Sequence, residues 1–271
     1  MNFSKFYKCF CLFGFSSLLF SENQNFISSQ EDASQPKMQQ VNLTDKNSRL
    51  RIGGDYSYVH LALTGFPSFN GNLGGAQFSY EYRPSDAVYA VVASSWKQGQ
   101  LNASNIKGSL LYFDAHEALG YTVSLYNRAI NWSFFVGLGY RYFTQKFIVE
   151  AGDRLGYRFE FLYIPVGMLF EYEASDYLTL GLDFTWQPQT YPTHANPLSG
   201  VRWVLQLESF YVAVPFEFKL NKSKDFHLVI SPFYERWQDV TKITTPSRKR
   251  LKGPSVTYDF AGVDVNLGYS F

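Results

Sequence analysis

The chain ends with residues 261–271, AGVDVNLGYSF, in which apolar or aromatic side chains alternate with small or polar ones. A repeat of two residues is typical of a β-strand, because successive side chains point to opposite faces of the sheet. One face of such a strand carries Ala261, Val263, Val265, Leu267, Tyr269 and Phe271. The stretch therefore predicts a terminal strand with one apolar face and one polar face.

The same alternation recurs in earlier segments, most clearly in residues 178–186 (LTLGLDFTW) and 130–142 (INWSFFVGLGYRY). Segments of this kind are expected at residues 51–62, 73–83, 87–97, 108–125, 130–146, 157–173, 177–187, 201–220, 226–239 and 256–271. Short connections alternate with longer ones at residues 63–72, 98–107, 147–156, 188–200 and 240–255. This arrangement predicts an antiparallel barrel of ten strands with both termini at one end. Eight or twelve strands are the alternatives, because some segments alternate poorly.

The apolar faces can point either into a water-soluble core or outward into lipid. Glycine and small residues are frequent on the polar faces, and many segments exceed the usual strand length of about five or six residues. Aromatic residues also gather at segment ends, as they do at membrane interfaces. These aromatic residues are Tyr140, Tyr142, Tyr163, Tyr172, Trp186, Trp203, Trp237 and Tyr269. We therefore predict an all-β fold, a transmembrane up-and-down barrel with a polar lumen.

The composition supports a membrane barrel and argues against several other classes of protein. Aromatic residues make up 19% of the chain and charged residues only 17%, against about 25% charged residues in a typical soluble domain. Basic and acidic residues balance at 24 and 23, so no nucleic-acid partner is expected. The only cysteines are Cys9 and Cys11, and the four histidines are scattered. We therefore expect no metal site and no cofactor.

The N-terminal part of the sequence differs from the rest. Residues 1–21 resemble a secretory signal peptide, because two lysines precede the apolar stretch CFCLFGFSSLLF at residues 9–20. Residues 22–49 are polar and have no apolar repeat, which predicts a disordered lead-in. The barrel is then expected to occupy residues 50–271.

Residues 50–271, and the terminal strand above all, resemble the small outer-membrane β-barrels of Gram-negative bacteria, which include opacity-type, OmpA-like and OmpX-like proteins. This resemblance implies an outer-membrane location and contact with outer-membrane lipid. It also implies that Val265, Leu267, Tyr269 and Phe271 form the signal read by the barrel-assembly machinery. Asn266 stands near a position where the family frequently has glycine, which is a departure from the pattern.

A ten-stranded barrel also resembles the omptin surface proteases. That resemblance implies an acidic pair facing an Asp-x-His pair near the external rim. Asp114 and His116 fit the second pair and are able to act as an acid and a general base on one inward face. The segment QGQLNASNIKG at residues 98–108 lacks the matching acids. We therefore expect a hydrogen-bonded structural pair and no enzymatic activity, with an omptin-like or lipid-modifying surface hydrolase as the alternative.

Charged residues on the polar faces are predicted to point into the lumen. They are Asp114, His116, Arg141, Glu171, Asp183, Glu217, Lys219 and Asp264. Buried charges are costly unless they are paired or hydrated. Either Arg141 and Lys219 bridge the acids and plug the barrel, which we favour, or water fills a narrow channel that prefers cations.

The last expected external loop, at residues 240–255, is strongly basic. It carries Lys242, Arg248, Lys249, Arg250 and Lys252 and contains no acidic residue. Beside the phosphates of lipopolysaccharide, such a loop predicts a polyanion-facing surface, with plain solvation as the alternative. The expected overall function is an envelope-structural or surface-exposed role, with a weak small-solute pore left open.

Overall fold

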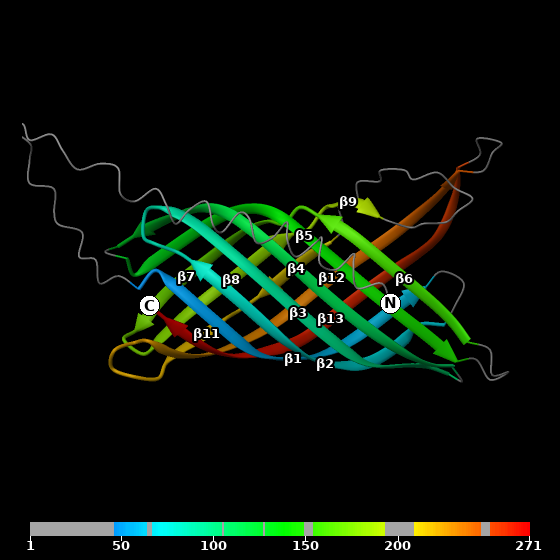
Figure 1. The fold of residues 1–271 in the computed structure, drawn as a ribbon, viewed down its shortest axis with the longest axis horizontal. Coiled ribbons are helices and arrows are strands. Elements are labelled where there is room, and N and C mark those ends of the chain that lie inside the picture. Colours follow the sequence, from blue (N-terminus) through cyan, green and yellow to red (C-terminus); the bar gives the residue numbers. More distant parts are fainter. Residues whose placement is uncertain are drawn as a thin grey trace, which may run out of the picture. The chain divides into compact units, whose positions relative to one another are not determined.

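Every regular element in the described part of the chain is a β-strand. The computed structural model describes residues 46–63, 67–104, 106–126, 128–148, 154–192, 209–244 and 250–271. The strands, shown in Figure 1, are β1 (Ser48–Leu63), β2 (Phe69–Tyr82), β3 (Val88–Ala103), β4 (Ile106–Leu125), β5 (Ile130–Ile148), β6 (Arg154–Tyr163), β7 (Val166–Ser175), β8 (Leu178–Trp186), β9 (Gln189–Pro192), β10 (Phe210–Ala213), β11 (Phe216–Lys219), β12 (Phe226–Thr244) and β13 (Arg250–Ser270). Within the described residues, no helix is long and apolar enough to cross a membrane.

Three passes of the chain along the wall are each divided in two by a proline. Pro165 lies between β6 and β7, Pro188 between β8 and β9, and Pro215 between β10 and β11. Proline has no N–H to donate, so the hydrogen-bond ladder is interrupted although the chain continues in the same direction. Counted with each divided pair as one pass, the strands form ten passes.

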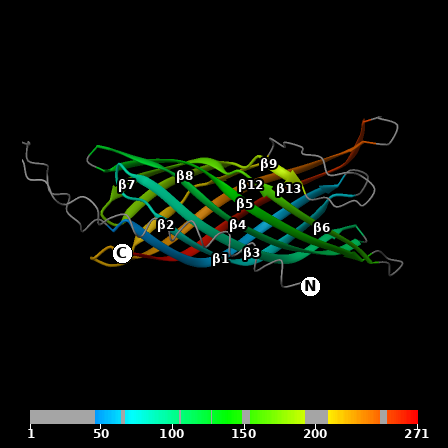
Figure 2. The ribbon, with the colours of Figure 1, turned by 45° about the horizontal axis from the view of Figure 1, so that its top comes forward.

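The barrel is antiparallel and closed. Neighbouring passes pair in sequence order, and β13 pairs with β1 from Arg49 opposite Ser270 to Leu63 opposite Val256. The prediction of a ten-stranded antiparallel barrel is therefore confirmed. Both chain ends of this unit lie at one end of the barrel, which we call the periplasmic end because bacterial barrels have their short turns there. Figure 2 shows the start of β1 and the end of β13 side by side at that end.

The predicted N-terminal segments lie almost wholly outside the described residues. Residues 1–45, which include the expected signal peptide, are not among them. β1 begins at Ser48, two residues before the predicted start of the barrel at residue 50. Arg49 therefore belongs to the wall rather than to the lead-in.

The apolar face points outward over the periplasmic part of the barrel. On β13, Val265 and Leu267 are 45% and 60% exposed, whereas Asp264 and Asn266 are 7% and 8% exposed. A water-soluble sheet has the opposite polarity, with its apolar side chains buried. The prediction that these apolar side chains meet lipid is confirmed, since only a membrane offers them an apolar environment.

The polarity of the two faces reverses farther along the same strands. On β1, Asp55 and Ser57 give way to the buried, inward-facing Val59 and Leu61, while His60 lies outside. The register of β1 with both neighbouring strands is continuous, so the same side chain positions keep pointing inward. The reversal therefore reflects a change in the environment outside the barrel. A barrel with an apolar interior and a polar exterior is suited to water, and we infer that the external section extends beyond the membrane.

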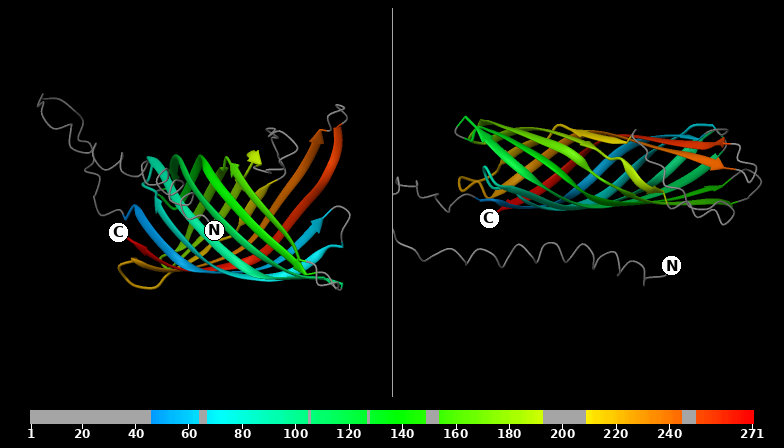
Figure 3. Two further views of the ribbon diagram at one scale, coloured as in Figure 1. Left: turned by 45° about the vertical axis from the view of Figure 1, so that its right-hand side comes forward. Right: turned by 90° about the horizontal axis from the view of Figure 1, so that it is seen from above.

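Several expected external loops are wrong, because strands occupy much of them. β3 and β4 leave only residues 104 and 105 between them, and Ser104 has a φ of 44°. β12 and β13 convert most of residues 240–255 into a paired ribbon, which reaches beyond neighbouring strands in Figure 3. Polar side chains such as Gln98 and Gln100 suggested loops, but they lie on wet outer faces of strands.

Two of the aromatic residues expected at membrane interfaces lie inside the barrel. Tyr163 and Trp237 are 2% and 1% exposed, and both point inward. Tyr172 and Tyr269 lie on the outer face, and Trp203 falls outside the described residues. The expectation for both residues is wrong. Trp237 lies where the inner face of its strand becomes apolar, and Tyr163 points inward because its hydroxyl donates to the buried Asp114.

Candidate functional site

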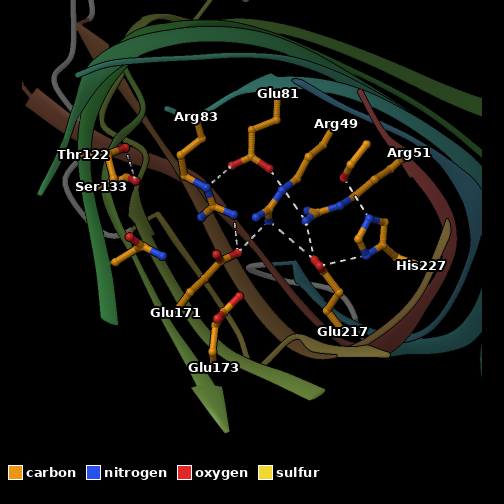
Figure 4. A network of polar contacts seen from close by, with 12 residues as sticks. Arg49, Arg51, Glu81, Arg83, Thr122, Ser133, Glu171, Glu173, Glu217 and His227 are labelled. Carbon is orange, nitrogen blue, oxygen red and sulfur yellow. Dashed lines mark hydrogen bonds and ion pairs between the residues drawn. The ribbon is translucent and has the colours of Figure 1, made fainter. Parts of the chain in front are cut away.

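Three arginines and three glutamates cross the lumen at the periplasmic end (Figure 4). We call this group the arginine–glutamate layer: Arg49, Arg51, Arg83, Glu81, Glu171 and Glu217. The Nη1 atom of Arg49 lies 3.1 Å from Glu171 Oε1, Arg51 Nη2 lies 3.0 Å from Glu217 Oε2, and Arg83 Nε lies 3.4 Å from Glu81 Oε1. Arg83 also pairs with Glu171. Equal numbers of opposite charges offset the desolvation cost of burying each one.

His227 lies at the edge of this layer, on β12. Its Nε2 atom is 2.7 Å from Ser270 Oγ on β13. Its Nδ1 atom is 3.1 Å from Glu217 Oε1 on β11. The imidazole is therefore hydrogen-bonded through Nε2 alone, while Nδ1 lies at ion-pair distance from the carboxylate without hydrogen-bond geometry.

A second polar group lies deeper in the barrel, around Arg141. Its Nε atom donates to Asp114 Oδ2 at 2.8 Å, and its Nη2 atom lies 2.7 Å from Glu235 Oε1. The hydroxyl of Tyr163 donates to Asp114 at 2.9 Å, and His116 Nδ1 is 3.2 Å from the same carboxylate. Asp114, the acid of the predicted Asp-x-His pair, thus already has three polar partners.

An internal cavity of about 220 Å³ lies among these groups. Lys97 points into it and lies 2.9 Å from Asp55 Oδ2, while Asp264 sits opposite Asp55 on the neighbouring strand. Asp183 also lines the cavity and accepts a hydrogen bond of 3.0 Å from Thr185. The charged side chains that line the chamber therefore include more acids than bases.

A layer of buried aromatic rings fills the lumen on the external side of the cavity. This aromatic layer consists of Tyr112, Phe143, Phe161, Trp237, Tyr258 and Phe260. The ring centroid of Phe143 lies 4.8 Å from those of Trp237 and Tyr258, and Phe161 lies 4.6 Å from Trp237. Rings at these distances are in van der Waals contact.

The eight predicted lumen residues all occupy inward positions. Asp114, His116, Arg141, Asp183 and Asp264 line the cavity, and Glu171 and Glu217 belong to the arginine–glutamate layer. Lys219 lies at the periplasmic rim, where its Nζ atom is 2.8 Å from Glu173. Arg141 bridges two acids as expected of a plug, whereas Lys219 contacts an acid at the rim.

Several residues of these layers were not predicted from the sequence as lumen residues. Arg49 was assigned to the lead-in, and Lys97, Glu235 and the aromatic layer were not singled out. Arg49 and Arg51 continue the inward repeat of β1 toward its start, which is the signal that identifies them. No comparable local signal marks Lys97, because its partner Asp55 comes from a strand two passes away.

The remaining predicted sites lie on or beyond the outer face. Val265, Leu267, Tyr269 and Phe271 are all exposed on the outer side of the chain end. The expected basic loop is wrong as a loop: Lys242 and Lys252 are cross-strand partners in β12 and β13, and Arg250 is opposite Thr244. Arg248 and Lys249 lie outside the described residues.

Comparison with solved structures finds similar barrels. OmpT, an outer membrane protease of Escherichia coli, shares 12% identity with a TM-score of 0.54, covering 84% of this chain and 98% of its own. Ail, the attachment invasion locus protein of Yersinia pestis, shares 11% identity with a TM-score of 0.36, covering 81% and 99%. OprG from Pseudomonas aeruginosa shares 11% identity with a TM-score of 0.34, covering 83% and 97%.

No protein-family model matches the chain, and comparison with curated proteins gives no match. Identities this low establish a shared fold and nothing finer. The lipid-facing belt of the barrel is an independent observation and indicates a membrane environment. The chain therefore has the fold of the small outer-membrane β-barrel proteins that its terminal strand resembles, and it belongs in the outer membrane.

Proposed function

We propose that the protein is a closed outer-membrane barrel with an envelope-structural or surface-exposed role, rather than a solute pore. The observation that carries this proposal is the aromatic layer. Its rings come from β4, β5, β6, β12 and β13 and are in contact across the lumen. An ion passing this layer would lose most of its hydration and would meet mainly aromatic carbon, which is costly.

The arginine–glutamate layer supports the same proposal from the periplasmic side. Each of its glutamates contacts at least one arginine. Breaking a buried ion pair leaves an uncompensated charge, which costs about 3–5 kcal/mol. A solute entering the lumen has to displace several such pairs before it reaches the cavity.

A structural role for Asp114 and His116 fits this closed barrel. Arg141 and Tyr163 already occupy the carboxylate of Asp114. The pair also lies beneath the aromatic layer, whereas the omptin resemblance implies a position near the external rim. These observations favour a stabilising pair over a protease centre.

A surface role is supported by the ribbon of β12 and β13. Its register makes Lys242 and Lys252 direct partners, and cross-strand partners share one face of a sheet. A paired ribbon fixes the backbone positions of its residues more firmly than a solvated loop does, which lowers the entropy cost of binding a phosphate. We propose that this ribbon faces lipopolysaccharide, and that the outer face of β13 engages the barrel-assembly machinery.

Planar-bilayer recording of the refolded full chain tests the closed-barrel proposal. We expect no discrete conductance levels from the native chain. The Phe143→Ala/Trp237→Ala variant opens the aromatic layer, and Phe134→Ala/Trp132→Ala removes the same residue types from the outer face as a matched control. Discrete open levels from the native chain would overturn the proposal.

A further inference from the structure

Ser270, His227 and Glu217 form a chain of three side chains at the periplasmic end of the lumen. The hydroxyl of Ser270 is hydrogen-bonded to His227 Nε2 at 2.7 Å. His227 Nδ1 lies 3.1 Å from Glu217 Oε1, and Figure 4 shows these two side chains facing one another. All three side chains are buried. A hydroxyl, an imidazole and a carboxylate connected in this order are the constellation of a serine nucleophile, its base and the group that orients the base.

The strand register explains why these three residues meet. His227 on β12 is opposite Gly268 on β13 and opposite Lys219 on β11. Ser270 and Glu217 each lie two positions from those partners, so they are diagonal neighbours of the histidine on either side. Gly268 has no side chain, and this keeps the space between His227 and Arg51 free.

Glu217 is held in a way that suits an orienting group. Its Oε1 atom faces the histidine, while its Oε2 atom lies 3.0 Å from Arg51 and 3.5 Å from Arg49. Separate partners for the two oxygens fix the plane of the carboxylate. An Nδ1–H tautomer would direct its proton toward Glu217 Oε1 and leave Nε2 free to accept a proton from Ser270.

Positive charge lies beside the hydroxyl as well. Arg49 is the direct cross-strand partner of Ser270, so the two side chains start from adjacent positions on the inner face. The Arg49 and Arg51 side chains are 22% and 21% exposed, which makes this side of the layer the one that solvent reaches. A guanidinium in this position is able to stabilise an oxyanion formed next to Ser270.

We propose that Ser270, His227 and Glu217 form a hydrolytic centre for small carboxylic esters that enter from the periplasmic side. Ser270 Oγ attacks the ester carbonyl carbon as His227 Nε2 takes its proton, and the alcohol leaves with that proton. Water then attacks the acyl-serine, His227 accepts a proton from it and returns one to Ser270, and the carboxylic acid is released. Glu217 acts through the histidine as a positioning residue.

This inference goes beyond the closed barrel proposed above and does not rest on it. The three side chains lie at the periplasmic end, whereas closure of the lumen depends on the aromatic layer. It also differs from the surface hydrolase considered from the sequence, because His116 has a carboxylate neighbour but no serine hydroxyl among its hydrogen bonds in the described residues. Conductance measurements therefore test the closed barrel, and labelling of Ser270 tests the hydrolytic centre, so either proposal can fail without the other.

The test uses the refolded full chain, a fluorophosphonate probe and p-nitrophenyl acetate. We expect the probe to modify Ser270, as located by mass spectrometry of the digested protein, and the acetate to be hydrolysed above the background rate. Ser270→Ala should abolish both. His227→Gln is still able to hydrogen-bond to Ser270 but cannot act as its base, and it should slow labelling by about 10³-fold or more.

Two matched controls separate catalysis from damage to the barrel. Ser57→Ala removes another buried inward hydroxyl, and His116→Gln removes the other inward histidine that faces a carboxylate. Both should keep labelling at Ser270 unchanged. Folding of every variant is checked by the shift in electrophoretic mobility between heated and unheated samples.

Three results would overturn the proposal: an unlabelled Ser270 in the folded native chain, unchanged labelling in folded His227→Gln, or labelling lost in His116→Gln instead. The positioning role of Glu217 has its own readout. Glu217→Gln should lower kcat without changing KM, and Glu217→Asp should restore part of kcat. Equal loss in both variants would show that Glu217 serves only the ion pairs.

Discussion

Asp55 on β1 and Asp264 on β13 are direct cross-strand partners inside the barrel, and Lys97 on β3 lies 2.9 Å from Asp55. Two carboxylates directly opposite one another would destabilise a sheet, and the lysine offsets the buried charge of Asp55. Lys97→Met should lower the free energy of unfolding by about 3–5 kcal/mol, the cost of an unpaired buried charge. Urea unfolding in detergent micelles, followed by tryptophan fluorescence, measures this. The Lys97→Met/Asp55→Asn double variant should recover part of the loss, and no recovery would contradict the pairing.

The reversal of polarity along β13 predicts where the membrane ends. Val265→Arg places a cation on the lipid-facing side and should cost about 2–4 kcal/mol of folding free energy. Thr257→Arg lies on the same outer face of the same strand, in the section with a polar exterior, and should cost little. Refolding into phospholipid vesicles with urea titration gives both values. Similar costs at the two positions would place the membrane boundary elsewhere.

The aromatic layer should contribute strongly to stability as well as to closure. Trp237→Ala removes a fully buried ring that contacts Phe143, Phe161 and Tyr258, and it should cost about 3–5 kcal/mol. Trp132→Ala on the outer face removes the same side chain from a partly exposed site and should cost less. The comparison uses the midpoint of urea unfolding. An equal effect of the two substitutions would argue that the layer is loosely packed.

The ribbon of β12 and β13 should bind lipopolysaccharide through its paired lysines. Lys242→Gln/Lys252→Gln should weaken binding in a salt-dependent manner, because the interaction is between charges. Lys107→Gln/Lys146→Gln removes two exposed external lysines that are not partners and serves as the control. Titration with native and with dephosphorylated lipopolysaccharide distinguishes phosphate recognition from general adhesion. Unchanged binding in the first variant would exclude the ribbon.

Local patterns in the sequence predicted the fold well. Alternation in β13 and β8 concerns neighbouring residues, so it can be read without knowing which strands pair. The same reasoning failed for Trp237, because an inward tryptophan is expected only where the exterior is wet. Polar outer positions such as Gln98 were read as loop for the same reason.

The candidate sites depended on information that the sequence does not carry locally. Ser270 and His227 are far apart in the chain and meet only because β12 and β13 pair in one particular register. Arg49 joins Glu171 from the opposite side of the lumen. A shift of one residue in either pairing would turn these side chains to the other face of the wall.

The three prolines that interrupt the wall have a mechanical consequence. Pro165, Pro188 and Pro215 fall on three consecutive passes, and Pro232 lies within β12 on the next, so several lateral N–H donors are missing from this sector. On heating, the hydrogen bonds between these three passes should break first. The backbone amides of these passes should exchange with deuterium sooner than those of β4 and β5. The positions of these prolines would then determine the order in which the strands of the barrel unfold.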